Sequence, residues 1–279
     1  MKFLLIILTL VSIPSVVVFS TGASSTLPLT TVAKATTNDI EMEQQIIGIL
    51  AQIVPYTSHI EHLKVNAVIA RTYITNGMRD LLPLSQDVLK ELWQDNYQNI
   101  YTIYKEAIDL TADEIIYYDN SPIEPIFHQT SPGVTRDGAQ VYGSEIPYLK
   151  SVDASVDNVI EETSFEIQSF IDTLKLHYPG IYISLEYFDK QIQIVQTVDG
   201  YINQIQFGSI ILDENDLLSI FNLPTSNATI TTTDTHIIFT TNGVGDGVGL
   251  SQNASAIYAQ EGSDYKSIIE HFYTGVTVY

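Results

Sequence analysis

The chain contains no cysteine among its 279 residues. This absence excludes disulfide bonds, cysteine-ligated zinc, iron–sulfur clusters and thiol nucleophiles. Any chemistry must therefore use carboxylates, histidine, hydroxyl groups or lysine. His59 and His62 are spaced for one face of a predicted helix, but no third ligand is evident, so we expect a surface pair. We predict neither a metal site nor a cofactor.

Positive charge is also scarce, with 12 Lys and Arg against 33 Asp and Glu, for a net charge of −21. No basic patch offsets this field, so we expect no nucleic-acid partner. The glycine-rich loop Gly243–Gly249 lacks the Gly-Lys-Ser/Thr ending of a nucleotide-binding loop. The hydrophobic content of 45% is nevertheless enough to fill a core, which indicates a folded protein.

The N-terminus is typical of an exported protein. Lys2 precedes an uncharged apolar run of 17 residues, from Phe3 to Phe19. As a helix this run would span about 25 Å, slightly less than a bilayer core, so a cleaved signal and a retained anchor both remain open. We expect a signal peptide or, preferably, a membrane anchor at residues 1–20 and a Ser/Thr-rich linker at 21–38. One extracytoplasmic domain is expected at 39–279.

Apolar periodicity divides this domain into helical and extended segments. We predict a helix from Ile40 that ends at Pro55 and a second helix capped by Ser58. Further helices are expected at 85–109, 158–177, 213–221, 251–260 and 264–273. Strands are expected at 113–118, 123–128, 181–188, 191–198, 201–211 and 228–240, with turns at Asp119–Pro122 and Val198-Asp-Gly200. Segregated helices and antiparallel strands define an α+β fold, with a helical N-terminal part packed against the strands.

Several blocks of sequence carry a resemblance to a known family. The first block is Gly48-Ile-Leu-Ala-Gln-Ile-Val-Pro55, which leads into Leu63-Lys-Val-Asn-Ala-Val-Ile-Ala-Arg-Thr-Tyr73. The second is Phe127-His-Gln-Thr-Ser-Pro-Gly-Val-Thr135, followed by Tyr148-Leu-Lys-Ser-Val152 and Asp157.

The third block is Gly245-Asp-Gly-Val-Gly-Leu-Ser-Gln252, which runs on to Ile269-Glu-His-Phe-Tyr-Thr-Gly275. In order and spacing these blocks resemble the stage II sporulation protein D family, which includes the amidase enhancers of bacterial cell walls. The resemblance extends from about Ile40 to the C-terminus.

The resemblance implies work on peptidoglycan during engulfment. Family members with an assigned reaction are lytic transglycosylases, which cleave glycan strands already stripped of stem peptides, alongside a cell-wall amidase. Such a cleavage needs a carboxylic acid with a raised pKa to protonate the leaving oxygen. The muramic acid 6-hydroxyl closes the ring, so one carboxyl group can serve as acid and then as base, unlike the pair that hydrolases use.

The reaction centre departs from the family pattern. The family has its acid, a Glu, two residues before the proline that ends the first helix, where this chain has Ile53. The neighbouring Gln52 is an amide and cannot replace the acid. Asp246 stands where the family usually shows His, between two glycines that let a backbone approach a ligand closely. Asp246 is therefore a candidate acid, and a turn-stabilising bond to its own backbone is the alternative.

The remaining blocks imply glycan contacts. Arg71 is suited to hold a carboxylate, with an internal salt bridge favoured over a muramic acid, and Tyr73 is suited to stack on a sugar or to fill the core. The expected glycan-binding residues are Arg71, Tyr73, His128, Thr130, Ser131, Gly245, Gly247, Ser251 and Gln252. The leading prediction is a peptidoglycan-remodelling protein of this family. The alternative is a catalytically silent glycan-binding scaffold that recruits or stimulates a cell-wall amidase, with membrane engulfment proteins as further partners.

Overall fold

The computed structural model describes residues 39–77 and 80–279, which form two compact units. Unit 1 combines the described residues up to Ile126 with Gln252–Tyr279, and unit 2 is Phe127–Ser251. Both units lie within the region that the sequence predicts to be folded. The predicted anchor and linker at residues 1–38 lie outside the described residues. Within the described ranges, no helix is both long and apolar enough to cross a membrane.

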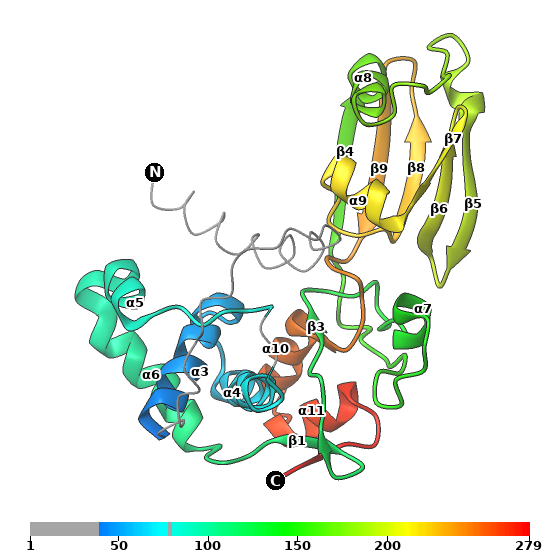
Figure 1. The fold of residues 1–279 in the computed structure, drawn as a ribbon. Helices are drawn as coiled ribbons and strands as arrows, with labels where there is room; N and C mark the ends of the chain where they lie inside the picture. The colour runs from blue at the N-terminus through cyan, green and yellow to red at the C-terminus, as the bar shows by residue number, and fades with distance from the viewer. Residues whose placement is uncertain (1–38, 78–79) are drawn as a thin grey trace. The chain divides into compact units, whose positions relative to one another are not determined.

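The first part of unit 1 is a cluster of helices: α3 (Asp39–Ile53), α4 (Ile60–Thr75), α5 (Gln86–Trp93) and α6 (Tyr97–Asp109). Figure 1 shows these helices in blue to green. The apolar stripe of α3 is buried as predicted, at Ile46, Ile49 and Leu50, and the helix ends before Pro55. The cap of α4 is His59, whose side chain accepts a hydrogen bond from Glu61 N, and not the predicted Ser58.

The helical region predicted at 85–109 is confirmed, but it divides into two helices. Gln94 adopts a left-handed backbone with φ of +46°, which ends α5, and the 3-10 turn η1 (Gln94–Asn96) connects it to α6. The kink keeps the aromatic side chains together, because the ring centroid of Trp93 lies 5.9 Å from that of Tyr97 and 5.8 Å from that of Tyr104. Packing thus redirects a segment whose apolar pattern is helical throughout.

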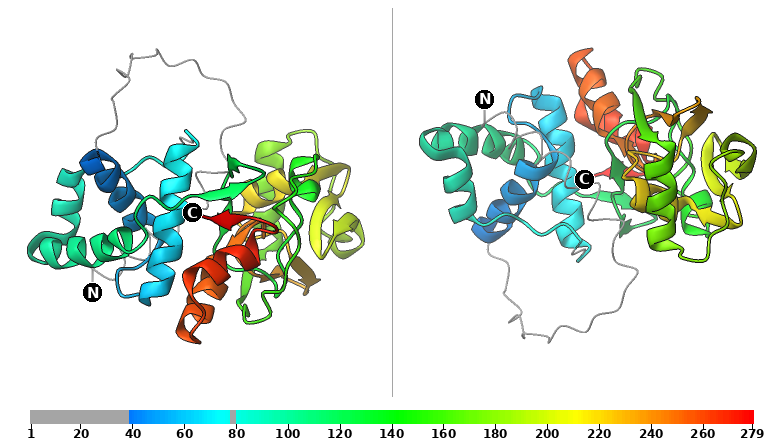
Figure 2. Two further views of the ribbon diagram at one scale, coloured as in Figure 1. Left: turned by 90° about the horizontal axis from the view of Figure 1, so that it is seen from below. Right: turned by 90° about the horizontal axis from the view of Figure 1, so that it is seen from above.

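The C-terminal strand of unit 1 pairs with a strand far earlier in the sequence. Strand β1 (Ile116–Tyr118) pairs antiparallel with β2 (Ser121–Pro122) on one side and with β11 (Thr277–Val278) on the other. Helices α10 (Gln252–Gln260) and α11 (Tyr265–Phe272) contact α4, and Figure 2 shows the C-terminal segment in red.

The hairpin between β1 and β2 has the predicted turn. Asp119 and Asn120 have φ of +48° and +61°, as a two-residue type I′ turn requires. The strand predicted at 123–128 is wrong apart from β3 (Phe127–His128).

Unit 2 is built on two three-stranded antiparallel sheets. The first has the order β4 (Ile160–Glu166), β9 (His236–Asn242), β8 (Ala228–Thr232). The second has the order β5 (Ile192–Val198), β6 (Tyr201–Phe207), β7 (Ile210–Asp213). Helices α8 (Ile167–His177) and α9 (Glu214–Phe221) cover them, as Figure 1 shows. The rings of Phe170 and Phe221 stack 4.2 Å apart at the centre of the core.

Several element predictions in unit 2 need correction. The predicted helix 158–177 begins only at Ile167, because the preceding residues form β4, which pairs with β9 along its full length. The predicted strand 228–240 is the hairpin β8–β9, and the predicted strand 201–211 divides into β6 and β7 at Gly208. The turn at Asp199 and Gly200 is confirmed. The combination of helices and antiparallel sheets confirms the α+β class.

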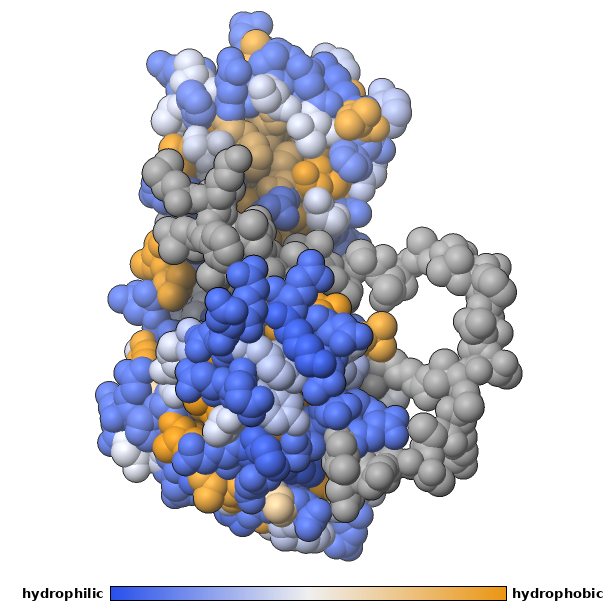
Figure 3. Space-filling model, turned by 90° about the vertical axis from the view of Figure 1, so that its left-hand side faces the viewer, coloured by the Kyte–Doolittle hydropathy of each residue, from blue (hydrophilic) through white to orange (hydrophobic). Residues whose placement is uncertain are grey.

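The strand predicted at 181–188 is also wrong. The segment forms no ladder, and a side chain takes the place of a neighbouring strand. Gln191 Oε1 accepts a bond of 3.0 Å from Ser184 N, and Gln191 Nε2 donates one of 3.0 Å to Ser184 O. Tyr182, in the same segment, is 79% exposed. Figure 3 shows that hydrophilic residues predominate on the face it draws, with hydrophobic residues in separate patches.

A buried polar network connects α4 to α10 within unit 1. His62 Nδ1 lies 2.9 Å from Ser255 Oγ, and Gln252 Nε2 donates to Asn66 Oδ1 at 2.7 Å. Asn66 in turn donates to His62 O at 2.9 Å. His62 is only 3% exposed, which corrects the predicted surface pair, and burial lowers its pKa to about 4. The imidazole is therefore neutral in the folded protein at pH 7.

The stability of the protein should depend on pH through His62. In the unfolded chain its pKa is about 6.5. Between pH 6.5 and 4 the imidazole is therefore protonated in the unfolded state and neutral in the folded state. The protein has its full free energy of unfolding, as far as His62 is concerned, above pH 6.5. That free energy decreases by up to about 3 kcal/mol as the pH falls towards 4. We expect His62→Gln to flatten the pH dependence of the urea unfolding midpoint between pH 7 and 4. His177→Gln, an exposed control, should keep the wild-type slope.

Candidate functional site

Two motif-bearing segments run side by side through unit 2. Strand β3 pairs parallel with β10 (Leu250–Ser251), which places His128 opposite Ser251. The backbones of Thr130 and Val244 exchange hydrogen bonds of 3.1 and 2.9 Å. Arg136 N then donates to Gly247 O at 2.7 Å. The second and third sequence blocks, far apart in the chain, thus form one local structure.

Three glycines make this close approach possible. Gly243, Gly245 and Gly247 have φ of +92°, +105° and +79°, a region that side chains disfavour. A Cβ atom on Gly243 would lie 2.8 Å from Thr130 O, and one on Gly245 would lie 2.9 Å from His128 Cβ. A Cβ atom on Gly247 would collide with the Tyr201 hydroxyl. The space beside these glycines is therefore occupied by the protein itself, where the sequence suggested a ligand.

One carboxylate oxygen binds the serines of both segments. Asp157 Oδ2 accepts hydrogen bonds from Ser131 N at 2.7 Å, Ser131 Oγ at 2.9 Å and Ser251 Oγ at 2.7 Å. Both serines are fully buried, and Asp157 is nearly so. In this geometry the two hydroxyl groups bond within the protein and do not face a sugar.

His128 and Asp246 form the titratable part of the site. His128 is buried, and its Nδ1 donates to Val248 O at 3.0 Å. Burial lowers the pKa of His128 against the opposing effect of Asp246, so the neutral ring leaves Nε2 as an acceptor that has no partner among the described residues. Thr130 Oγ1, also buried, likewise has no partner in this part of the chain.

Asp246 combines the two alternatives that the sequence raised. Its Oδ1 accepts a bond of 3.0 Å from Val248 N, the turn-stabilising contact within its own loop. Burial nevertheless raises the pKa of Asp246, opposed by that bond and by the neighbouring His128 and Arg136. A carboxyl group that holds its proton closer to neutral pH fits a general acid, so the turn contact and the chemistry are compatible.

The other predicted residues lie in unit 1. Arg71 is buried and donates to two backbone carbonyls, Ile108 O at 3.2 Å and Glu114 O at 3.1 Å. It also donates to the Thr111 hydroxyl at 3.5 Å, and no carboxylate of the described chain forms an ion pair with it. The Tyr73 hydroxyl accepts a bond from Leu81 N, and the Gln252 amide bonds to Asn66. All three side chains serve internal contacts.

Position 53 is the last residue of α3. Ile53 is partly buried and packs against the helical core of unit 1. The adjacent Gln52 donates to Gly48 O at 2.8 Å and to Leu82 O at 2.9 Å, so it fastens the segment before α5 to α3. Neither residue offers a proton for transfer.

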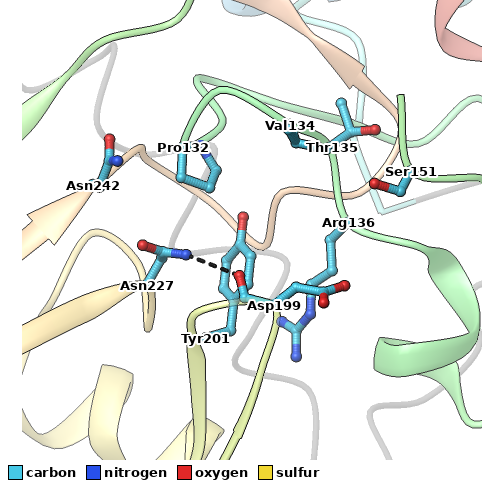
Figure 4. Close-up of a pocket in the computed structure, with 9 residues that line it drawn as sticks. All are labelled: Pro132, Val134, Thr135, Arg136, Ser151, Asp199, Tyr201, Asn227 and Asn242. Atoms are coloured by element: carbon cyan, nitrogen blue, oxygen red, sulfur yellow. Dashed lines mark hydrogen bonds between the residues drawn. The ribbon is translucent and has the colours of Figure 1, made fainter. Parts of the chain in front are cut away.

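A cleft of about 470 Å³ in unit 2 was not predicted from the sequence. Its lining, drawn in Figure 4, is Pro132, Val134, Thr135, Arg136, Ser151, Asp199, Tyr201, Asn227 and Asn242. Pro132, Val134 and Thr135 belong to the second motif, Ser151 to the block that follows it, and Asp199 to the predicted turn before β6. Their convergence with Asn227 and Asn242 was not predicted, because those two asparagines stand beside strand ends that carry no recognisable pattern.

Comparison with known proteins identifies the relatives of this chain. The family model described as stage II sporulation protein matches residues 31–118. Stage II sporulation protein D of Bacillus amyloliquefaciens is 27% identical over 90% of this chain and 78% of its own length. The protein of the same name from Bacillus subtilis (strain 168) is 25% identical over the same shares. An uncharacterised protein of Brachyspira hyodysenteriae is 27% identical over 86% of this chain and 67% of its own length.

The structure and these matches agree on the class of protein. It is an α+β protein whose motif-bearing loops meet in one unit. The chain is similar to proteins named stage II sporulation protein D, as its sequence blocks predicted.

Gly247 should tolerate no side chain. We expect Gly247→Ala to destabilise the protein by about 2 kcal/mol, because alanine is strained at positive φ and its Cβ displaces the Tyr201 ring. Gly180→Ala is the matched control within unit 2, since no atom lies within 4 Å of its Cβ position. Its unfolding midpoint in urea should match the wild type. Equal midpoints for both variants would contradict the described loop.

Proposed function

We propose that this protein acts on the glycan strands of peptidoglycan during the cell-wall processing that accompanies sporulation. The relationship to stage II sporulation protein D over 90% of the chain carries the proposal. The meeting of the second and third sequence blocks in unit 2 supports it, because the resemblance implies glycan contacts in both blocks. The apolar N-terminal run supports a place outside the cytoplasmic membrane, with the chain anchored there.

The first form of the proposal is strand cleavage of the lytic transglycosylase type. Asp246 is the residue proposed as proton donor, because its carboxyl group has a raised pKa and lies beside His128. The acid would protonate the leaving glycosidic oxygen, and its carboxylate would then accept the proton of the muramic acid 6-hydroxyl as the ring closes. No water enters this sequence of steps.

The second form is a glycan-binding scaffold without cleavage. It is favoured by Ile53, which stands where the resemblance places the family's acid and which cannot transfer a proton. In this form the protein holds a strand and recruits or stimulates a cell-wall amidase, together with membrane proteins of engulfment. The two forms share glycan binding and differ only in whether bonds are broken.

Replacing Asp246 by Asn decides between the two forms. The full-length protein is incubated with peptide-stripped glycan strands, and anhydro-muramic ends are measured by mass spectrometry. If Asp246 is the acid, Asp246→Asn should reduce these ends about 100-fold or more while retention on peptidoglycan stays unchanged. Asp234→Asn, in the exposed β8–β9 turn, is the control.

Unchanged turnover in Asp246→Asn would remove Asp246 as the acid. Intact strands with the wild-type protein, still retained on them, would establish the scaffold. Absence of retention would defeat both forms.

Placing a carboxylic acid at position 53 tests whether this position can serve as the reaction centre, as the resemblance implies. We expect Ile53→Glu to raise the production of anhydro-muramic ends at least tenfold above Ile53→Gln, which has the same shape without an acidic proton. Partial burial at the end of α3 should raise the pKa of the new carboxyl group and keep it protonated. Equal products from the two folded, strand-binding variants would show that position 53 is not the reaction centre.

A further inference from the structure

The second sheet of unit 2 has an open edge at β5. This strand pairs with β6 on one side, and no strand of the described residues pairs with it on the other. Figure 1 shows β5 as the outermost strand of its sheet. Its five central residues, Gln193–Thr197, are all exposed. The backbone N–H and C=O groups on the open side of such a strand are a template for pairing with another strand.

The core face of the sheet is also incompletely covered at β5. Ile194 lies directly opposite Ile205, which in turn lies opposite Leu212. Residues paired in this way point to the same face, so the three side chains form one apolar row. Ile205 and Leu212 are fully buried, whereas Ile194 is 43% exposed. A further strand beside β5 would extend the row and remove the apolar surface of Ile194 from water.

The other open edges of unit 2 are protected against pairing. Strand β4 carries three glutamates, and β7 has only four residues, of which the last is the exposed Asp213. Strand β8 faces the second sheet, as Figure 1 shows, and Ile202 N donates to Ser226 O at 3.0 Å just before it. Charges, short strands and covered edges are common protections of this kind. Strand β5 has seven residues and contains neither a charge nor a proline.

One irregularity interrupts β5 without ending its ladder. The pairing with β6 slips around Val195. Gln193 lies opposite Gln206 before the slip and Thr197 lies opposite Ile202 after it, so the strands return to their original register. The strand therefore offers one continuous edge.

We propose that β5 pairs antiparallel with β5 of a second copy of this chain, which joins two three-stranded sheets into one of six strands. In such an isologous pair the two-fold axis crosses the middle of the strand, near Val195, and each residue meets a residue of the same uncharged set. Glutamine amides both donate and accept hydrogen bonds, so Gln193 and Gln196 match their own copies.

The charge of the protein favours a second copy as the occupant of this edge. With a net charge of −21, two copies repel each other at their charged surfaces, and β5 is a surface without charge. A partner attracted by opposite charge would bind the acidic surfaces instead. The uncharged edge and its self-matching amides therefore fit a copy of itself.

The opposite edge of the sheet limits the assembly to two copies. Once both β5 strands are paired, the outermost strands of the six-stranded sheet are the two β7 strands. Each is short and ends in Asp213, which opposes further pairing. The proposed assembly is thus a closed dimer and not an open fibre.

The first test measures the oligomeric state of the full-length protein in a mild detergent by sedimentation velocity over a range of concentrations. We expect a reversible monomer–dimer equilibrium in the wild type. Val195→Lys should raise the concentration needed for half dimerisation at least tenfold, because two lysines then meet across the two-fold axis. Ile211→Lys is the matched control, since it makes the same charge change at an exposed site on β7 and should dimerise as the wild type does.

Circular dichroism establishes that both variants are folded. A wild type that stays monomeric up to its solubility limit overturns the proposal. An equal shift in the two lysine variants also overturns it, because the association would then depend on overall charge and not on β5.

The second test uses the absence of cysteine from the chain, which makes a single introduced thiol unique. Gln196 and Gln204 are both exposed and lie opposite each other on β5 and β6. In the proposed dimer the two copies of residue 196 lie on adjacent strands, whereas the two copies of residue 204 are separated by three strand spacings, about 14 Å.

A bis-maleimide with its reactive ends about 8 Å apart, less than two strand spacings, should therefore discriminate between the two positions. We expect at least tenfold more covalent dimer from Gln196→Cys than from Gln204→Cys at equal labelling. Equal yields from the two variants overturn the β5 pairing. Neither test involves a glycan, so both outcomes are independent of the proposed function.

Discussion

The carboxylate of Asp157 is the contact on which the site of unit 2 depends. It accepts three hydrogen bonds, from the backbone N–H and the hydroxyl of Ser131 and from the hydroxyl of Ser251. One carboxylate thus holds the two motif-bearing segments together. Hydrogen bonds to a charged group are worth about 1.5–3 kcal/mol each, and a buried carboxylate left without them is costly. The glycine loop between Gly243 and Gly249 can therefore lie against the 128–136 segment with its backbone within hydrogen-bond reach.

Local features of the sequence predicted much of the fold. The helix that ends at Pro55 and the Asp-Asn and Asp-Gly turns were predictable, because proline and left-handed turn residues act within a few positions. Strand β4 was mistaken for a helix because its residues gain their pattern only by pairing with β9, far along the chain. The strand predicted at 181–188 was wrong for a different reason. The segment alternates like a strand, but the Gln191 side chain makes the hydrogen bonds to the Ser184 backbone that a neighbouring strand would make.

The site was less predictable than the fold. The blocks predicted the similarity to stage II sporulation protein D. They did not predict where each side chain points, because a serine in a motif reads the same whether it faces a sugar or, as Ser131 and Ser251 do, Asp157. Arg71 illustrates the same limit, because it donates to backbone carbonyl oxygens that no side-chain pattern reveals. The cleft was missed because Asp199, Asn227 and Asn242 converge from separate turns and strand ends.

The pairing of β1 with β11 has a consequence for the order in which the protein is completed. Unit 2 is one uninterrupted stretch of chain, whereas unit 1 joins two stretches separated by the whole of unit 2. During synthesis the central β1 has no outer neighbour until Thr277 and Val278 have been made. Domains tend to fold as units as they emerge, and distant pairings form late. The unit whose chain begins first is thus the one that is completed last, after the whole of unit 2 has been synthesised.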